Sequence, residues 1–217
     1  NTLNLDKTKK YFYLLAANIY SILARFDKAA QAYESMIREV KGTEEYLYEL
    51  AAVYEYANRP EDAIKAYTRA VEVMGVNEIS SGQKQRLYLE AGKTKEALAE
   101  GEKLVNAFPD EERYIMAFTE VLSQKGLRNE AITYLEKFVT ANAEAGNARM
   151  LLAGFYRDTN QEQKARPLLL SLFEDINIDL AGKLIVLGAY NAELHQNRAN
   201  NQSDPDKEAF ALSLFEK

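Results

Sequence analysis

Large and small apolar residues recur along the chain with a spacing of 34 residues. One tyrosine series with this spacing comprises Tyr20, Tyr54 and Tyr88. An alanine series with the same spacing comprises Ala29, Ala63, Ala97, Ala131 and Ala165. A third series comprises Tyr33, Tyr67, Gly101, Leu135 and Leu169. Three series that share one period indicate an internal repeat.

Each repeat has the pattern of two helices joined by a turn. In residues 46–70, apolar residues first follow the i, i+3, i+4, i+7 spacing of one helical face, as Leu47, Leu50, Ala51 and Tyr54. A break follows at residues 58–60, where Pro60 suits the first position of a second helix. The second helix then carries Ala63, Tyr67 and Ala70. Alternation of small and bulky residues suits helices that approach closely, and we expect Ala17, Ala51 and Ala153 at such contacts.

Three stretches depart from the regular pattern. The turn positions Gly92, Gly126 and Asn160 suit a left-handed backbone, whereas Ala24 does not, so we expect the first turn to be built differently. Residues 80–85 are mostly polar and predict a short or loosely packed helix. Pro167 falls inside a predicted helix and is expected to kink or delay it.

The last repeat contains a polar insertion near residues 195–206. Its second helix does not appear on schedule, and the stretch is rich in Asn and Gln. We expect a long loop there, followed by a helix near Lys207 in which Ala211 and Phe215 restore the alanine-to-aromatic step.

These residues resemble the tetratricopeptide repeat family over about residues 10–194. The second repeat matches the family pattern at Leu47, Leu50, Ala51, Tyr54, Ala63, Tyr67 and Ala70. Other matches are Tyr88, Gly92, Ala97, Pro109, Gly126, Ala131, Leu152, Ala153, Tyr156 and Ala165. The resemblance implies an all-α solenoid with a right-handed superhelix. It also implies a single array over 1–217, with units near 10–43, 44–77, 78–111, 112–145, 146–179 and 180–217.

The resemblance further implies a concave groove, lined by the first helix of each unit, that accepts a peptide segment of a partner protein. Family positions that face this groove fall on Tyr11, Asn18, Tyr48, Tyr56, Arg86, Arg113, Met116, Met150 and Arg157. One hypothesis is that apolar side chains of the peptide meet Tyr48 and Tyr56, while its acidic groups meet the three arginines. The alternative is that the rings only cover neighbouring helices and the arginines pair with local glutamates.

The amino-acid composition argues against most kinds of catalytic or metal-binding site. The chain has no Cys and one His, His195, so Cys or His clusters for metal or nucleophilic catalysis are excluded. Its acidic pairs, such as Glu61-Asp62, are typical of solvated helix starts. The run from Gly92 to Ala97 lacks the rest of a phosphate-binding loop. We therefore predict no catalytic, cofactor-binding or metal site, and no enzyme activity.

Net charge and the length of the apolar runs indicate which class of partner the chain binds. A formal net charge of −6 argues against nucleic acid, which needs a basic surface. The apolar runs are too short to insert into a membrane. We expect a protein or peptide ligand held by a non-enzymatic scaffold. The alternative is a structural or self-association segment of a larger protein, which the missing initiator Met also suggests; the compartment, cytoplasmic or exported, stays open.

Overall fold

Helices make up most of the chain. The computed structural model describes the backbone from residue 2 to residue 217 and the side chains from Lys9 onward. The described residues form α-helices and one 3₁₀ turn, with no strand. The α-helices are α1 (Thr2–Ile22), α2 (Phe26–Glu39), α3 (Leu47–Tyr56), α4 (Pro60–Met74), α5 (Glu78–Glu90), α6 (Thr94–Ala107), α7 (Glu112–Gln124), α8 (Arg128–Ala141), α9 (Gly146–Asp158), α10 (Glu162–Glu174), α11 (Leu180–Ala199) and α12 (Pro205–Phe215).

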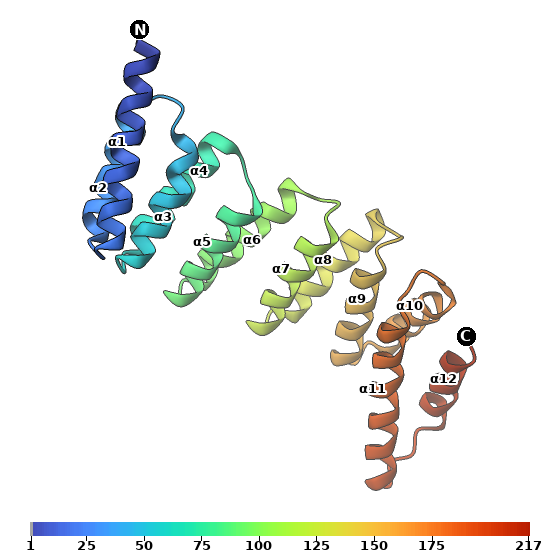
Figure 1. Ribbon diagram of the computed structural model, residues 1–217. Coiled ribbons are helices and arrows are strands. Elements are labelled where there is room, and N and C mark those ends of the chain that lie inside the picture. Colours follow the sequence, from blue (N-terminus) through green and yellow to red (C-terminus); the bar gives the residue numbers. More distant parts are fainter. Residues whose placement is uncertain (1) are drawn as a thin grey trace. The chain divides into compact units, whose positions relative to one another are not determined.

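Consecutive helices pair as hairpins (Figure 1). The chain divides into two compact units, which we call unit 1 (residues 1–108) and unit 2 (residues 109–217). Unit 1 contains the hairpins α1–α2, α3–α4 and α5–α6, in which α2 packs on α3 and α4 packs on α5. Unit 2 contains α7–α8, α9–α10 and α11–α12, in which α8 packs on α9 and α10 packs on α12. The predicted all-α stack of helix hairpins is confirmed.

The periodic alanines lie in the core. Ala29, Ala63, Ala97, Ala131 and Ala165 are all 0% exposed. Ala17, Ala51 and Ala153 on the first helices are also 0% exposed, as expected for sites of close helix approach. Larger side chains fill the space beside them, for example Leu50, Tyr67, Leu135 and Leu169. The sequence period therefore marks the packing contacts correctly.

The turns inside the first five hairpins share one conformation. Ala24, Asn58 and Asn160 have φ between 53° and 59°, and Gly92 and Gly126 have φ of 71° and 79°. In each turn the next residue donates its backbone N–H to a carbonyl five residues earlier, as Arg25 does to Tyr20 at 2.8 Å and Arg59 does to Tyr54 at 2.9 Å. This is the Schellman arrangement at a helix C-terminus. The expectation that Ala24 builds a different turn was wrong, because these backbone bonds hold alanine in the left-handed region.

α5 is neither short nor loosely packed, contrary to the prediction. It has 13 residues, as α7 does, and its Ser80, Ser81, Lys84 and Leu87 are buried. The Lys84 ammonium lies 3.0 Å from the carboxylate of Glu100 on α6, and this pair replaces an apolar contact inside the hairpin. The helix packs through a buried charge pair that hydropathy cannot reveal.

Pro167 does not delay α10, which begins at Glu162 and continues through the proline to Glu174. The proline is exposed and lies in the second turn of the helix. Its missing N–H therefore removes at most one backbone hydrogen bond on the solvent side.

The predicted long loop in the last repeat is mostly helix. α11 has 20 residues and includes residues 195–199 of the polar stretch, and α12 begins at Pro205, which leaves only residues 200–204 between the two helices. The left-handed turn residue is Asn201, with φ of 57°. α12 buries Phe210 and Leu214, whereas Phe215 is 76% exposed. The predicted step from Ala211 to Phe215 was therefore misplaced by one residue.

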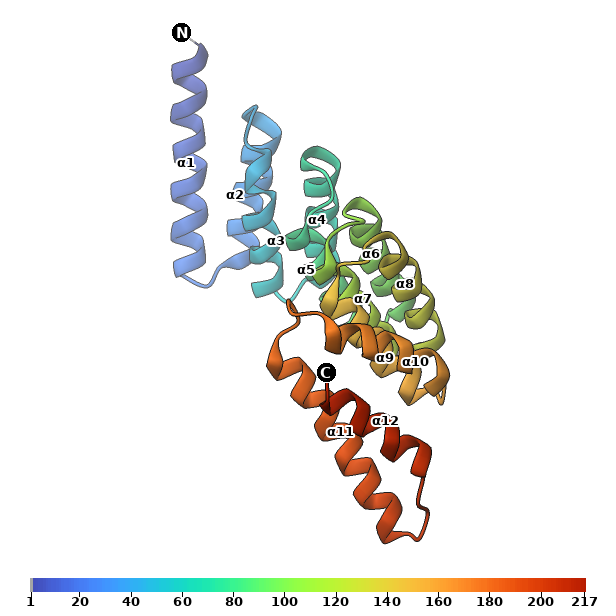
Figure 2. The ribbon, with the colours of Figure 1, turned by 90° about the vertical axis from the view of Figure 1, so that its right-hand side faces the viewer.

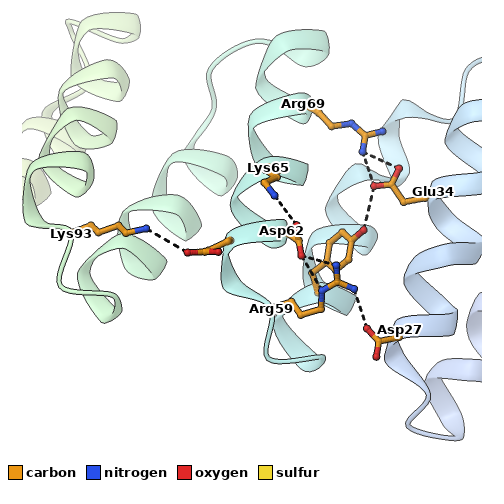
Figure 3. Close-up of polar contacts among 9 residues, drawn as sticks. Asp27, Glu34, Arg59, Asp62, Lys65, Arg69 and Lys93 are labelled. Carbon is orange, nitrogen blue, oxygen red and sulfur yellow. Dashed lines mark hydrogen bonds and ion pairs between the residues drawn. The ribbon is translucent and has the colours of Figure 1, made fainter.

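Ion pairs connect neighbouring hairpins on the surface of unit 1 (Figure 3). Arg59 lies 3.0 Å from Asp27 on α2 and also contacts Asp62. Lys93 lies 3.7 Å from Glu61, which is the same pairing one repeat later. These side chains are largely exposed, so each pair contributes no more than about 1 kcal/mol. The buried core residues, rather than these ion pairs, therefore provide most of the stability of the stacked hairpins.

Candidate functional site

Three first helices of unit 2 surround an apolar hollow, which we call the unit 2 groove. Its volume is about 490 Å³, within the range of small-ligand and side-chain pockets. It is lined by Met116 from α7, by Asn147, Met150, Leu151, Gly154, Phe155, Arg157 and Asp158 from α9, and by Ile185, Val186 and Ala189 from α11. Most of these side chains are apolar, so the hollow offers a surface for burying apolar groups.

Repeat spacing explains how the groove is assembled. Met116, Met150 and Leu184 are 34 residues apart, so they occupy the same position on α7, α9 and α11. Met150 reaches across to α11, where a Cβ added to Gly182 would lie 3.3 Å from the methionine methyl group. Ile185 is 74% exposed although it lines the groove. Methionine side chains adapt to varied apolar partners, which suits a binding surface.

Gly154 leaves a bare stretch of helix in the groove. A Cβ added at this position would meet no other atom within 4 Å. Glycine in a helix interior costs about 0.5–1 kcal/mol relative to alanine. No local backbone contact compensates for this cost at Gly154, and its effect is to keep the middle of the groove open.

The polar residues of the groove already have partners. Arg157 lies over the ring of Tyr190, 3.8 Å from its centroid, and donates a hydrogen bond to Glu193 at 2.9 Å. Asp158 pairs with Arg128 at 3.0 Å, and the amide of Asn147 donates to Glu112 at 3.2 Å. Burial alone would raise the pKa of Glu193, but Lys207 and Arg157 outweigh it and hold the pKa below its usual value. The charges therefore neutralise one another at the edge of an apolar lining.

The structure brings together three of the predicted site residues: Met116, Met150 and Arg157. In unit 1, Tyr48 and Tyr56 lie on α3 but contact different helices. Tyr48 packs against Tyr67 of α4, and Tyr56 stacks on Phe26 of α2 with centroids 5.5 Å apart. Tyr56 lines a separate, more polar hollow beside the first turn, with residues 24–28. Tyr11 and Asn18 are exposed on α1.

The other two predicted arginines also have local partners. Arg86 forms ion pairs with Glu55 and Glu90. Arg113 lies 4.5 Å from the centroid of the Tyr114 ring and 3.6 Å from Glu111. With Arg157 held by Glu193, all three arginines have nearby carboxylates. This pattern favours the alternative interpretation of the arginines as locally paired side chains.

Several groove residues were missed at the sequence level. Gly154, Phe155 and Ile185 line the groove but were not among the predicted site residues. Ile185 directly follows Leu184, which occupies the predicted position, so the repeat period places the site to within one residue on α11. Gly154 has a weaker signal, a glycine in the middle of an otherwise regular helix.

Two further findings concern other kinds of site. Within the described part of the chain, no group of three or more His, Cys, Asp or Glu side chains is arranged to hold a metal ion. None of the described helices combines the length and the apolar composition needed to cross a membrane.

Comparison with known proteins identifies the repeat. Residues 44–73 match the tetratricopeptide repeat family. No curated protein sequence matches the chain. The structure is similar to the C-terminal part of a tetratricopeptide repeat-containing protein from Cytophaga hutchinsonii, with a TM-score of 0.60 and 18% identity over 94% of this chain and 81% of that chain.

A tetratricopeptide repeat protein from Parabacteroides merdae ATCC 43184 is also similar in structure. Its TM-score is 0.51, with 15% identity over 96% of this chain and 78% of that chain. At these identities the likeness concerns the fold. The chain thus has the fold of tetratricopeptide repeat proteins, and residues 44–73 carry the sequence pattern of that family.

Proposed function

We propose that the chain is a non-catalytic binding module whose unit 2 groove holds an apolar segment of a partner protein. The tetratricopeptide repeat fold generally serves as a scaffold for protein–protein interactions. The observation that carries this proposal is the convergence of Met116, Met150 and Ile185 from three helices around one hollow. Each leucine-sized side chain buried there contributes about 1.5–3 kcal/mol of gross binding free energy.

Charge points to a basic rather than an acidic partner segment. Unit 2 contains 12 Lys and Arg residues against 17 Asp and Glu residues. Glu120 is exposed one helical turn after Met116, on the same side of α7. The cation of Arg157 is already matched by Glu193. A segment with Leu or Met side chains flanked by Lys or Arg suits this surface better than an acidic one.

A groove-filling variant tests the site. Gly154→Leu places a side chain in the open part of the groove and should not destabilise α9, because leucine is a better helix former than glycine. Gly188→Leu on α11 is the matched control, since Gly188 is exposed, lies outside the groove lining and also has open space around its Cβ position.

The measurement uses a random peptide library displayed on phage and panned on the full chain. We expect enriched peptides to combine Leu, Met or Phe with Lys or Arg. Their affinity should fall at least about tenfold in Gly154→Leu, a loss of about 1.4 kcal/mol, and stay unchanged in Gly188→Leu. Enrichment of acidic peptides, or equal binding to both variants, would contradict the proposal.

A further inference from the structure

α1 exposes a continuous apolar face. Phe12, Leu15, Ile19 and Ile22 are 70%, 61%, 47% and 79% exposed, and their spacing places them along one side of the helix. The opposite side, with Ala17, packs on α2. In Figure 2, α1 has a neighbouring helix of unit 1 on one side only. An exposed apolar stripe of this length marks an interaction surface.

The repeat register shows what kind of element this face accepts. Phe12 and Ile19 lie 34 residues before Tyr46 and Val53. Tyr46 stacks on Tyr33 of α2 with centroids 6.4 Å apart, and Val53 belongs to the core cluster that includes Ala29 and Ala30 of α2. The same face of α3, together with the 3₁₀ turn Glu44–Tyr46 that precedes it, therefore packs against the second helix of the preceding hairpin. The corresponding face of α1, which carries Phe12 and Ile19, is not covered by any described residue of the chain.

The other end of the chain exposes the complementary surface. Leu212 and Phe215 on α12 are 65% and 76% exposed. Together with Leu187, Leu194 and Ala211 they line a hollow of about 330 Å³ between α11 and α12. Within unit 2, α9 packs against both helices of the hairpin before it, α7 and α8. The hollow between α11 and α12 is the corresponding place for a following first helix.

One position shows how this surface differs from the interior ones. In α2 and α8 the residue after the periodic core position is Glu34 or Glu136, and it accepts a hydrogen bond from Tyr54 or Tyr156 of the next hairpin. In α12, Leu214 is the core residue, and Phe215 follows it. A hairpin in a repeat array buries an apolar face by stacking it on a neighbouring hairpin. The α1 face and the surface between α11 and α12 are both apolar and exposed.

We propose that the two ends bind each other between copies of this chain. The α1 face of one copy docks in the hollow between α11 and α12 of a second copy and continues the hairpin stacking from copy to copy. The interior contacts α2–α3 and α8–α9 are the pattern for this interface. Because the two surfaces differ, each docked pair leaves one α1 face and one hollow between α11 and α12 unused, so association continues beyond a dimer.

Two face variants of the full chain test the proposal. The first, Phe12→Asp with Ile19→Asp, blocks the α1 face. The second, Leu212→Asp with Phe215→Asp, blocks the α12 face. All four side chains are at least 47% exposed, so the fold should persist, which circular dichroism and thermal melting check. Molar mass is measured by light scattering coupled to size-exclusion chromatography over a series of concentrations.

We expect the mass of the wild-type chain to rise with concentration and each variant alone to stay monomeric. An equimolar mixture of the two variants should form a 1:1 dimer and nothing larger, because each partner retains one intact face. Gly154→Leu should associate like the wild type, so a failure of the proposed groove function would leave this result intact.

Three outcomes overturn the inference. If the wild-type chain stays monomeric at the highest soluble concentration, the two faces do not bind each other and must be covered by a different partner. Variants that associate as the wild type does place the contact elsewhere. A mixture that stays monomeric, although each single variant has lost association, indicates a symmetric contact instead of a head-to-tail one.

Discussion

Ala24 adopts a left-handed backbone conformation, and the equivalent positions in the other turns are occupied by Asn or Gly. Its φ is 53°, close to the 56° of Asn58 and the 59° of Asn160. Alanine pays a steric cost there, because its Cβ approaches the following carbonyl oxygen, whereas asparagine tolerates the region better. The turn forms nevertheless, since the hydrogen bond from Arg25 to Tyr20 closes it as in the other repeats.

Replacing this residue should therefore stabilise unit 1. We expect Ala24→Asn to raise the free energy of unfolding by about 0.5–1 kcal/mol. Asn58→Ala, the reverse change at an equally exposed turn, should lower it by a similar amount. Chemical denaturation measures both, and a stabilisation by either alanine would contradict the conformational argument.

The buried pair of Lys84 and Glu100 makes a second prediction for individual residues. Their side chains are 4% and 7% exposed. Glu100→Leu should destabilise unit 1 by about 3–5 kcal/mol, because Lys84 is left buried without its partner. Lys84→Met combined with Glu100→Leu should recover most of that loss, since two apolar residues suit the site. If the double variant is as unstable as the single one, denaturant titration will show that packing, rather than charge pairing, dominates.

For the helices, the periodic alanines are the most sensitive positions. Ala131 is 0% exposed in α8, and Ala141 is exposed at the end of the same helix. Ala131→Leu should overpack the hairpin and cost about 1–3 kcal/mol of unfolding free energy. Ala141→Leu should be nearly silent. Thermal or chemical unfolding of the two variants compares them directly, and equal effects would show that the repeat alignment is wrong.

The helices could be predicted where hydropathy reports packing, and their length or packing was misjudged where it does not. Leu47, Leu50 and Ala51 carry the helical period, and α3 lies where they place it. α5 has no such stripe, because Ser80, Ser81 and Lys84 occupy buried positions that are apolar in the other helices. Lys84 pairs there with Glu100 of α6, whereas the buried hydroxyl of Ser80 has no hydrogen-bond partner among the described residues. The extension of α11 was read as a loop because Asn and Gln are common in loops and yet are tolerated in exposed helix turns.

The candidate site could be predicted in part for a related reason. Repeat spacing identifies residues that share a helix face, and it led to Met116 and Met150. It cannot show which arginines are already paired, since Arg157 and Glu193 are 36 residues apart. Whether an arginine is paired with a carboxylate or available to a ligand depends on contacts between hairpins that form only in the folded chain.

Considered as a whole, the chain depends on tyrosine hydroxyls in both units. Tyr67 donates to Glu55 at 2.9 Å, Tyr156 to Glu136 at 2.6 Å and Tyr190 to Glu162 at 2.6 Å. Burial first, and then the adjacent carboxylate, raises the pKa of all three hydroxyls well above the ordinary value. The neutral phenol is therefore the form that the folded state favours.

This arrangement predicts loss of stability in alkaline solution. Because the folded pKa values lie above the unfolded value of about 10, the stabilisation is complete below about pH 10 and is lost as the pH rises through the folded values. Tyr67→Phe and Tyr156→Phe keep the rings but cannot ionise. Each variant should be less stable than the wild type at neutral pH, and the difference should shrink above about pH 10. Denaturation curves across this range measure it, and a constant difference would argue against the tyrosine assignment.

The lengthened α11 has a consequence for how such a chain can change. From Asn160, the repeat period places the next turn at residue 194, whereas the left-handed turn residue is Asn201, seven residues later. Seven residues advance an α-helix by almost two whole turns, about 20° short of a full rotation. Tyr190 therefore keeps its inward orientation while the tip of the last hairpin grows outward (Figure 1). An insertion of five residues would instead leave the added turn facing the opposite side, so growth in heptads is the least disruptive way for this hairpin to lengthen.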